Sequence, residues 1–181
     1  MRSLLSFIWE ISKIVVIALL IVIPIRYFLF QPFFVKGQSM EPNFENGDYL
    51  IVDELSFRFR DPQRGEVVVF KYPQNLSQRY IKRIIGLPGE TIEIKGGKVT
   101  ISGQEGSQAL DESNYLYLND FTSGEVRIPL TENEYFVMGD NRFSSSDSRS
   151  WGPLPKDDII GRVVFRAWPF AVFAKIEAPE Y

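Results

Sequence analysis

The 181-residue chain contains no histidine and no cysteine. Without histidine it lacks both the commonest general base of enzymes and the commonest metal ligand of proteins. Without cysteine it can form neither disulfides nor zinc sites built from thiolates. Any catalysis must therefore rely on other side chains, and we expect neither a metal site nor a cofactor.

A surplus of positive charge is absent as well. Lysine and arginine together number 20 against 23 aspartate and glutamate residues, which gives a formal net charge of −3. Because binding to a phosphate backbone requires clustered positive charge, we expect no nucleic acid partner. Once an N-terminal segment is set aside, the length suits one globular domain of ordinary size with its own core.

The N-terminal segment is strongly apolar. Residues 14–25 carry no charge, but this run alone is shorter than the roughly 20 residues of a membrane-spanning helix. Apolar and aromatic residues extend it on both sides, and Lys13 and Arg26 are long enough to reach the lipid head groups. We therefore expect a transmembrane helix over about residues 5–30, within an N-terminal membrane anchor of residues 1–32.

A cleaved signal peptide is the rival interpretation of this segment. A cleavage site of small residues should then follow the apolar core, but residues 26–35 offer bulky aromatic and aliphatic side chains instead. An uncleaved anchor is the better fit. The charges on the two flanks do not settle its orientation by the positive-inside rule.

Beyond the anchor, the sequence changes to the alternating pattern of strands. Short apolar runs are separated by turn residues, and residues 91–101 alternate apolar with polar around Gly96-Gly97, which predicts a hairpin. Short strands at regular spacing favour an all-β domain over residues 33–181. A segment rich in serine, glycine and asparagine, at about residues 102–123, is expected to be a small loop-rich insertion.

Four short motifs occur in the order of a known enzyme family. Ser39 lies in Val-Lys-Gly-Gln-Ser-Met-Glu-Pro and Lys82 in Tyr-Ile-Lys-Arg-Ile-Ile-Gly-Leu-Pro-Gly, with Gly-Asp-Tyr between them and Gly-Asp-Asn-Arg-Phe-Ser-Ser-Ser-Asp-Ser-Arg-Ser-Trp at residues 139–151. Over about residues 33–165 these runs resemble the boxes of the type I signal peptidases. The resemblance implies a membrane-bound serine endopeptidase that removes signal peptides from exported precursors. It also implies a partly open, barrel-like domain of antiparallel sheets behind one transmembrane helix.

The resemblance implies that Ser39 is the nucleophile and Lys82 the general base. A serine hydroxyl attacks poorly until a base takes its proton, and a neutral lysine amine can serve where imidazole is missing. Because the free pKa of lysine is about 10.4, the site must lower it, as burial of the amine does. Strand alternation places Lys82 on one face with Tyr80 and Ile84, and Arg83 on the other.

The same resemblance assigns supporting roles near the dyad. Ser145 matches a serine that hydrogen-bonds the catalytic amine, although three adjacent serines leave its register uncertain by one residue. Asp147 and Arg149 match a buried ion pair. We also hypothesise that Asp140 pairs with Arg83 and fixes the strand of Lys82. The expected supporting residues are Arg83, Gly139, Asp140, Ser145, Asp147 and Arg149.

The resemblance also implies how the substrate is held. Shallow apolar pockets would accept small side chains at the first and third positions before the cut, giving an Ala-x-Ala preference. The matching pocket positions are Phe33, Val35, Met40, Tyr80 and Ile81. A hydroxyl that often helps to hold the oxyanion in the family is replaced here by Gly37, so the backbone N–H of Ser39 is the only donor that the sequence identifies.

The resemblance places the catalytic domain on the extracytoplasmic or lumenal side of a membrane, such as the plasma membrane or the thylakoid. The expected partners are precursors that bear signal peptides, and membrane lipid. Two alternatives stay open, namely another Ser/Lys hydrolase, such as a self-cleaving repressor-type protease, and a membrane-tethered β-rich binding or assembly module without catalysis. The aromatic tail of residues 165–173 is expected either in the core or at the lipid interface.

Overall fold

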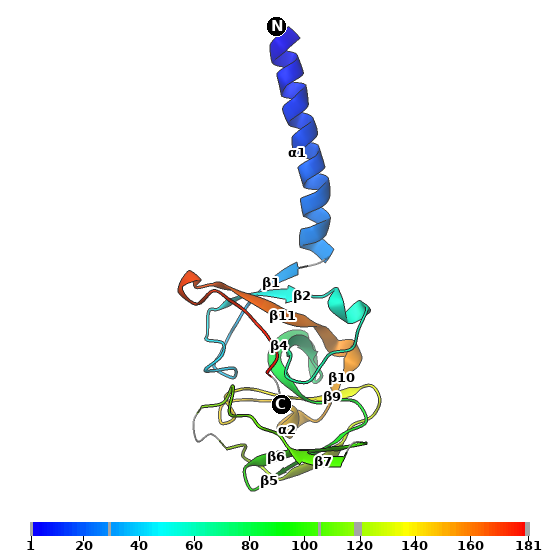
Figure 1. Cartoon of the computed structure of the whole chain (residues 1–181), viewed down its shortest axis with the longest axis vertical. Helices are drawn as coiled ribbons and strands as arrows, with labels where there is room; N and C mark the ends of the chain where they lie inside the picture. The colour runs from blue at the N-terminus through cyan, green and yellow to red at the C-terminus, as the bar shows by residue number, and fades with distance from the viewer. Residues whose placement is uncertain (1, 29, 105, 118–120, 180–181) are drawn as a thin grey trace.

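The computed structural model describes residues 2–28, 30–104, 106–117 and 121–179. The chain forms a long N-terminal helix, α1 (Arg2–Phe28), which stands away from a β-rich domain (Figure 1). Among the described residues, none of the helices is long and apolar enough to qualify as a membrane span. The helix ends earlier than the predicted residue 30, because the first strand begins at Phe30; Leu29 lies outside the described residues.

The domain is mostly β, as predicted, and its described strand pairings are all antiparallel. The strands are β1 (Phe30–Phe34), β2 (Tyr49–Asp53), β3 (Val67–Tyr72), β4 (Asn75–Gly86), β5 (Thr91–Lys95), β6 (Lys98–Gly103), β7 (Gly106–Ala109), β8 (Val126–Pro129), β9 (Glu134–Met138), β10 (Leu154–Pro155), β11 (Ile159–Trp168) and β12 (Ala174–Lys175). The helical elements within the domain are short: η1 (Ser56–Arg58), α2 (Ser148–Trp151), η2 (Lys156–Asp158) and η3 (Phe170–Val172).

The larger sheet has the strand order β1-β2-β11-β3-β4-β9-β10, with β12 paired to β11. Four antiparallel steps separate β1 from β4, so these two strands run in the same direction. Strand β9 pairs with β4 only from Arg83 to Gly86. The preceding part of β4 is therefore free of strand pairing on that edge, within the described part of the chain.

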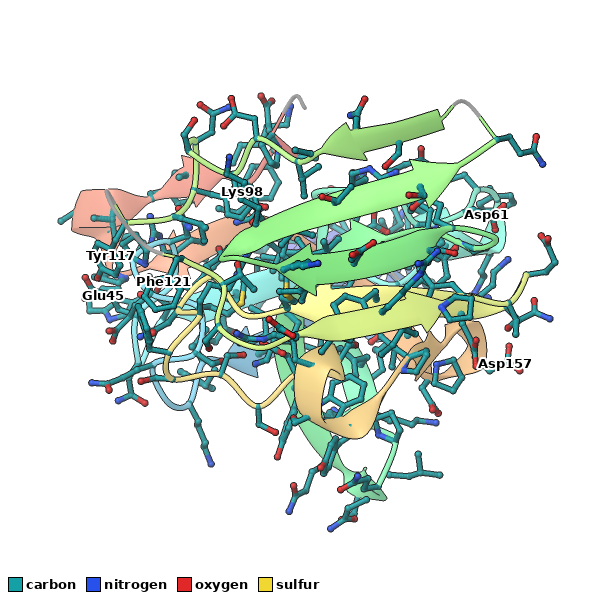
Figure 2. All side chains as sticks on the ribbon, turned by 90° about the horizontal axis from the view of Figure 1, so that it is seen from below. Glu45, Asp61, Lys98, Tyr117, Phe121 and Asp157 are labelled. Carbon is teal, nitrogen blue, oxygen red and sulfur yellow. The ribbon has the colours of Figure 1, made fainter. Side chains whose placement is uncertain are left out.

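The smaller sheet has the order β7-β6-β5-β8. In the view from the end opposite α1, its strands lie side by side across the domain (Figure 2). The predicted hairpin is present as β5 and β6, with Gly96 and Gly97 in the left-handed region at φ +57° and +81°. Glycine adopts this backbone conformation without steric cost.

The segment 102–123 departs from the loop that the sequence predicts. Strand β6 extends to Gly103, and β7 pairs with it through Ser102 and Ser107. The side chains of β7 are exposed, so apolar periodicity gave no sign of the strand. Pairing with the edge of β6 satisfies backbone groups whatever the side chains are. Residues 105 and 118–120 of this segment lie outside the described residues.

Buried apolar side chains form three clusters, one against the smaller sheet and two against the larger one. Strand β4 borders both clusters of the larger sheet, because Ile81 packs against one and Tyr80 and Ile84 belong to the other. Lys82 thus sits on a strand that is surrounded by apolar side chains. The C-terminal tail is not core, since Trp168 and Phe170 are 52% and 73% exposed.

Candidate active site

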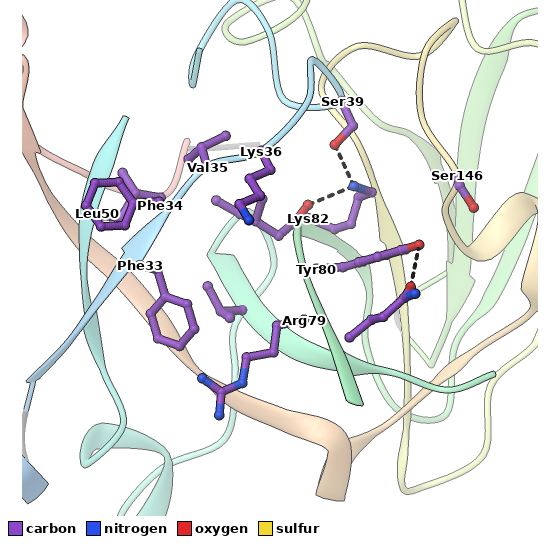
Figure 3. Close-up of a pocket in the computed structure, with 13 residues that line it drawn as sticks. Phe33, Phe34, Val35, Lys36, Ser39, Leu50, Arg79, Tyr80, Lys82 and Ser146 are labelled. Atoms are coloured by element: carbon purple, nitrogen blue, oxygen red, sulfur yellow. Dashed lines mark hydrogen bonds between the residues drawn. The ribbon is translucent and has the colours of Figure 1, made fainter. Parts of the chain in front are cut away.

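Ser39 and Lys82 meet at the centre of the larger sheet. Ser39 lies in the loop between β1 and β2, and Lys82 lies on β4. Lys82 Nζ donates a hydrogen bond to Ser39 Oγ over 2.7 Å and another to the Ile81 carbonyl over 2.8 Å (Figure 3). The fold therefore brings a hydroxyl and an amine into direct contact across 43 residues of sequence.

Lys82 is almost completely buried, at 3% exposure. Burial lowers the pKa of Lys82 from an ordinary 10.5 to about 8, while the charges of Asp147 and Asp140 act in the opposite direction. No carboxylate of the described residues lies within ion-pair distance of the amine. The site therefore favours an amine that loses its proton near neutral pH, as a general base must.

The serine loop is fixed at both of its ends. Val35 N donates to Asp48 O and Gly47 N donates to Val35 O, each over 2.9 Å. In addition, Asn141 N donates to the Ser39 carbonyl over 3.0 Å. These backbone hydrogen bonds hold Ser39 between its own loop and the turn that follows β9.

Gly139 lies where two chain segments approach closely. A Cβ at this position would lie 2.4 Å from the Ser39 carbonyl oxygen and would overlap the Ser145 hydroxyl. The backbone N–H of Gly139 donates to Asp147 Oδ2 over 3.0 Å. Only glycine leaves room for the Ser39 loop at this point.

Ser145 lies beside Gly139 with its hydroxyl buried. Its Oγ has no hydrogen-bond partner among the described residues, so the predicted bond to the Lys82 amine is not made here. A buried hydroxyl without a partner is costly. The Ser145 hydroxyl acts instead on Asp147, whose pKa it helps to lower.

Two buried ion pairs involve residues expected to support the site. Arg83 donates to both carboxylate oxygens of Asp140, over 2.8 and 2.6 Å. Arg149 contacts Asp147 over 2.8 Å. Burial acts to raise the pKa of Asp147, but the hydrogen bond and charge of Arg149 and the Gly139 N–H outweigh it and lower that pKa. Asp147 thus stays ionised and keeps its charge engaged with Arg149.

A third buried ion pair, which was not predicted from the sequence, joins Arg142 to Glu112. Arg142 is fully buried and donates to the Glu112 carboxylate over 2.8 and 2.5 Å. It also donates to Thr122 and to the Gly139 carbonyl. Arg142 therefore ties the segment before β8 to the turn that supports Ser39. Its position inside the motif at residues 139–151 was the available signal, but nothing in the sequence identified Glu112 as the partner.

A cavity of about 520 Å³ opens beside the dyad, between β1 and the free edge of β4 (Figure 3). Of the predicted pocket residues, Phe33, Val35, Tyr80 and Ile81 line it. Met40 does not line it, because its side chain is fully buried in the core under the serine loop. The other lining residues are Phe34, Lys36, Ser39, Leu50, Val69, Gln78, Arg79, Lys82 and Ser146.

Comparison with known proteins gives consistent matches. A family model described as signal peptidase, peptidase S26, matches residues 8–168. A probable signal peptidase I-2 from Synechocystis is 38% identical over 165 residues, which cover 88% of this chain and 73% of that protein. Signal peptidase IB from Staphylococcus aureus is 30% identical over 184 residues, covering 95% and 94%. A crystal structure of a signal peptidase I from Enterococcus faecalis is 31% identical, covers 57% of this chain and 97% of that one, and has a TM-score of 0.47.

Proposed function

The chain belongs to the signal peptidase family, peptidase S26, and is therefore a serine endopeptidase, and we propose that it removes signal peptides from exported precursors with Ser39 as nucleophile and Lys82 as general base. The observation that carries the proposal is the 2.7 Å contact between Ser39 Oγ and Lys82 Nζ. The amine is buried without a carboxylate partner among the described residues, which favours its neutral form.

The reaction follows from the two groups. Neutral Lys82 takes the Ser39 proton as Oγ bonds to the scissile carbonyl carbon, and the charged amine then returns the proton to the leaving nitrogen. The carbon–nitrogen bond breaks and the mature chain leaves with a new N-terminus. Water, activated by the same amine, then hydrolyses the acyl ester. Each step needs the amine to carry a proton only briefly, so a pKa near the working pH is required.

The Ser39 N–H is the donor we assign to the developing oxyanion. No acceptor among the described residues takes a hydrogen bond from this N–H, so it is available to the substrate. Position 37 offers no side-chain donor, and the Gly37 N–H already donates to Asn46 Oδ1 over 2.9 Å. We assign the Ser145 hydroxyl to the Lys82 amine in the substrate complex, where it would orient the amine in its neutral form without recharging it.

The substrate would lie as an extended segment in the cavity between β1 and β4. Both strands run in the same direction and both lead toward the dyad, so a segment that fills the cavity before the cut runs parallel to them. Backbone pairing supplies affinity without demanding a sequence. The bulky walls from Phe33, Val35 and Ile81 leave room only for small side chains at the first and third positions, as in Ala-x-Ala.

We include in the proposal that α1 anchors residues 33–181 to a membrane, with the catalytic domain on the extracytoplasmic or lumenal side. The described apolar side chains of α1 are exposed, for example Leu20 at 68%. Residues 14–22 of α1 are all apolar and exposed on every side of the helix, and apolar side chains around the whole circumference are a feature of helices that lie in a membrane. Trp168, at the end of β11, and Phe170, in η3, are both exposed, and we assign them to the lipid surface.

Cleavage of a defined precursor tests the function. Detergent-solubilised protein should cut a precursor bearing Ala-x-Ala, and the new N-terminus should follow the second alanine. The rate should rise with pH through about 8, the pKa of Lys82, because only the unprotonated amine is a base. Equal cleavage by Ser39→Ala, or a rate that is flat down to pH 5, would contradict the proposal.

A further inference from the structure

The active-site cavity has a charge opposite to that of the chain. Three of its lining residues, Lys36, Arg79 and Lys82, are basic and none is acidic, whereas the whole chain carries a net charge of −3. Lys82 belongs to the dyad. Lys36 and Arg79 have no part in the proposed chemistry, so their presence in the cavity calls for another explanation.

Lys36 and Arg79 are both exposed, and in the part of the chain that the structure describes neither forms an ion pair within 4.0 Å. The Arg79 guanidinium lies over the Phe33 ring, 5.4 Å from its centroid, and thus spans the cavity from β4 to β1. The charge of Arg79 acts on the carboxyl group of Glu54. Glu54 also interacts with the charge of Arg58, and burial raises the pKa of Glu54. The two cavity cations are therefore open to a carboxylate from outside.

The strand geometry locates these cations relative to the cut. Arg79 precedes Lys82 by three residues on β4, which corresponds to about 10 Å along an extended strand. A substrate segment parallel to β4 would place its fourth residue before the cut at that level. Lys36 precedes Ser39 by three residues in the loop and lines the same cavity (Figure 3). Both cations therefore lie beside the segment that precedes the scissile bond.

We propose that Lys36 and Arg79 make this enzyme prefer precursors with an acidic side chain among the five residues before the cut. The proposal rests on the proposed function and adds a charge preference to it. Side chains at the first and third positions face the apolar walls, so the intervening side chains point elsewhere and can reach a cation. Charge complementarity of this kind sets specificity.

Synthetic peptides test the preference directly. Each carries Ala-x-Ala and differs from a neutral parent by glutamate, glutamine or lysine at one of the other positions among the five residues before the cut. At low salt, kcat/KM for the best glutamate peptide should exceed that of its glutamine counterpart by up to about fivefold, the upper end of what an exposed ion pair contributes. The lysine peptide should be the poorest, and 1 M salt should reduce the difference because it shortens the Debye length to about 3 Å.

Variants assign the preference to the two cations. Lys36→Gln and Arg79→Gln should each lower the glutamate-to-glutamine ratio, and Arg79→Lys, which keeps the charge, should retain it. Lys98→Gln removes the same charge from β6 in the other sheet (Figure 2) and should leave the ratio unchanged. A ratio near one for wild type, or a preference that persists in the double variant, would overturn this inference alone. Failure to cleave any peptide would overturn the proposed function with it.

Discussion

Lys82 and Arg83 are neighbours on one strand with opposite surroundings. Both are cationic side chains, and they are buried to nearly the same degree, at 3% and 4% exposure. Lys82 contacts a hydroxyl and a carbonyl oxygen. Arg83 contacts the Asp140 carboxylate through two hydrogen bonds and the Gly65 carbonyl through a third. Lys82 is thus buried without an adjacent carboxylate among the described residues, whereas the charge of Arg83 is neutralised by Asp140.

The different surroundings of Lys82 and Arg83 show how one strand can carry both an amine that loses its proton and a cation that stays charged. An ammonium can lose its proton when burial lowers its pKa, whereas a guanidinium stays charged in proteins. A carboxylate beside Lys82 would hold the amine in its charged form and abolish its function as a base. A carboxylate beside Arg83 avoids an uncompensated buried charge. Burial lowers the pKa of Lys82, and no adjacent carboxylate among the described residues cancels this effect, whereas Arg83 stays charged and is neutralised by Asp140.

The largest effect is expected when Lys82 is replaced by arginine, the residue type of its neighbour Arg83. Lys82→Arg places a permanent charge at the dyad and removes the base, so kcat/KM should fall by about 10³-fold or more. Lys71→Arg, at an exposed position on β3, is the matched control and should retain activity. The measurement is cleavage of an Ala-x-Ala precursor. Retention of a tenth of the wild-type rate by Lys82→Arg would break the comparison.

Removing the counter-charge from Arg83 should produce the next largest effect. Asp140→Ala leaves a buried guanidinium without its carboxylate, and we expect a loss of about 3–5 kcal/mol in the free energy of unfolding. Asp61→Ala is the control, because its ion pair with Lys156 is exposed and should be worth at most about 1 kcal/mol. Urea unfolding of the detergent-solubilised protein measures both.

The charge exchange Arg83→Asp with Asp140→Arg separates pairing from other roles of these residues. If the ion pair fixes the strand of Lys82, the double variant should recover part of the stability and activity that each single change removes. A double variant no better than either single variant would show that the two side chains act independently of each other.

The antiparallel β fold and the regions of the candidate site could be predicted from local sequence. Alternation around Gly96-Gly97 predicted the β5–β6 hairpin, and the motifs around Ser39 and Lys82 pointed to two side chains that are in contact in the structure. Both signals lie within a few adjacent residues. The strand β7 was missed because its exposed side chains show no apolar period.

Partners distant in sequence could not be predicted. Glu112 and Arg142 are 30 residues apart, and no local pattern joins them. Met40 was expected in the pocket because of its place beside Ser39, but the side chain turns into the core. Which side of a loop residue faces the cavity depends on tertiary packing, which periodicity does not describe in an irregular segment.

A smaller effect is expected when the close approach at Gly139 is disturbed. Gly139→Ala forces the Ser39 carbonyl and the Ser145 side chain to move, and displacement of a nucleophile by about 1 Å can cost about 10²-fold in rate. Gly103→Ala is the control, because its Cβ would meet the nearest side-chain atom at an ordinary 3.6 Å. Full activity of Gly139→Ala would show that the turn after β9 does not position the nucleophile.

The smallest effect is a gain in stability from removing the catalytic amine. The pKa of Lys82 in the folded state is about 8, below its ordinary 10.5. Below pH 8 the amine is charged in both the folded and the unfolded state, so the whole cost of burying the charge destabilises the fold. Above about pH 10.5 the amine is neutral in both states, and this cost is gone. Lys82→Met keeps the length of the side chain and removes the charge. The difference between these two pKa values corresponds to about 3 kcal/mol, but the variant also loses the two hydrogen bonds of the amine. Its free energy of unfolding at pH 6 should therefore exceed that of wild type by about 1–2 kcal/mol, and this gain should disappear between pH 8 and 10.5. Denaturant unfolding at pH 6 and pH 10 measures this difference. Arg83→Met leaves the buried Asp140 carboxylate without its counter-charge and should destabilise the protein at both pH values. If Lys82→Met were instead less stable at pH 6, the amine would have to be stabilised by its surroundings, and the contrast with Arg83 would disappear.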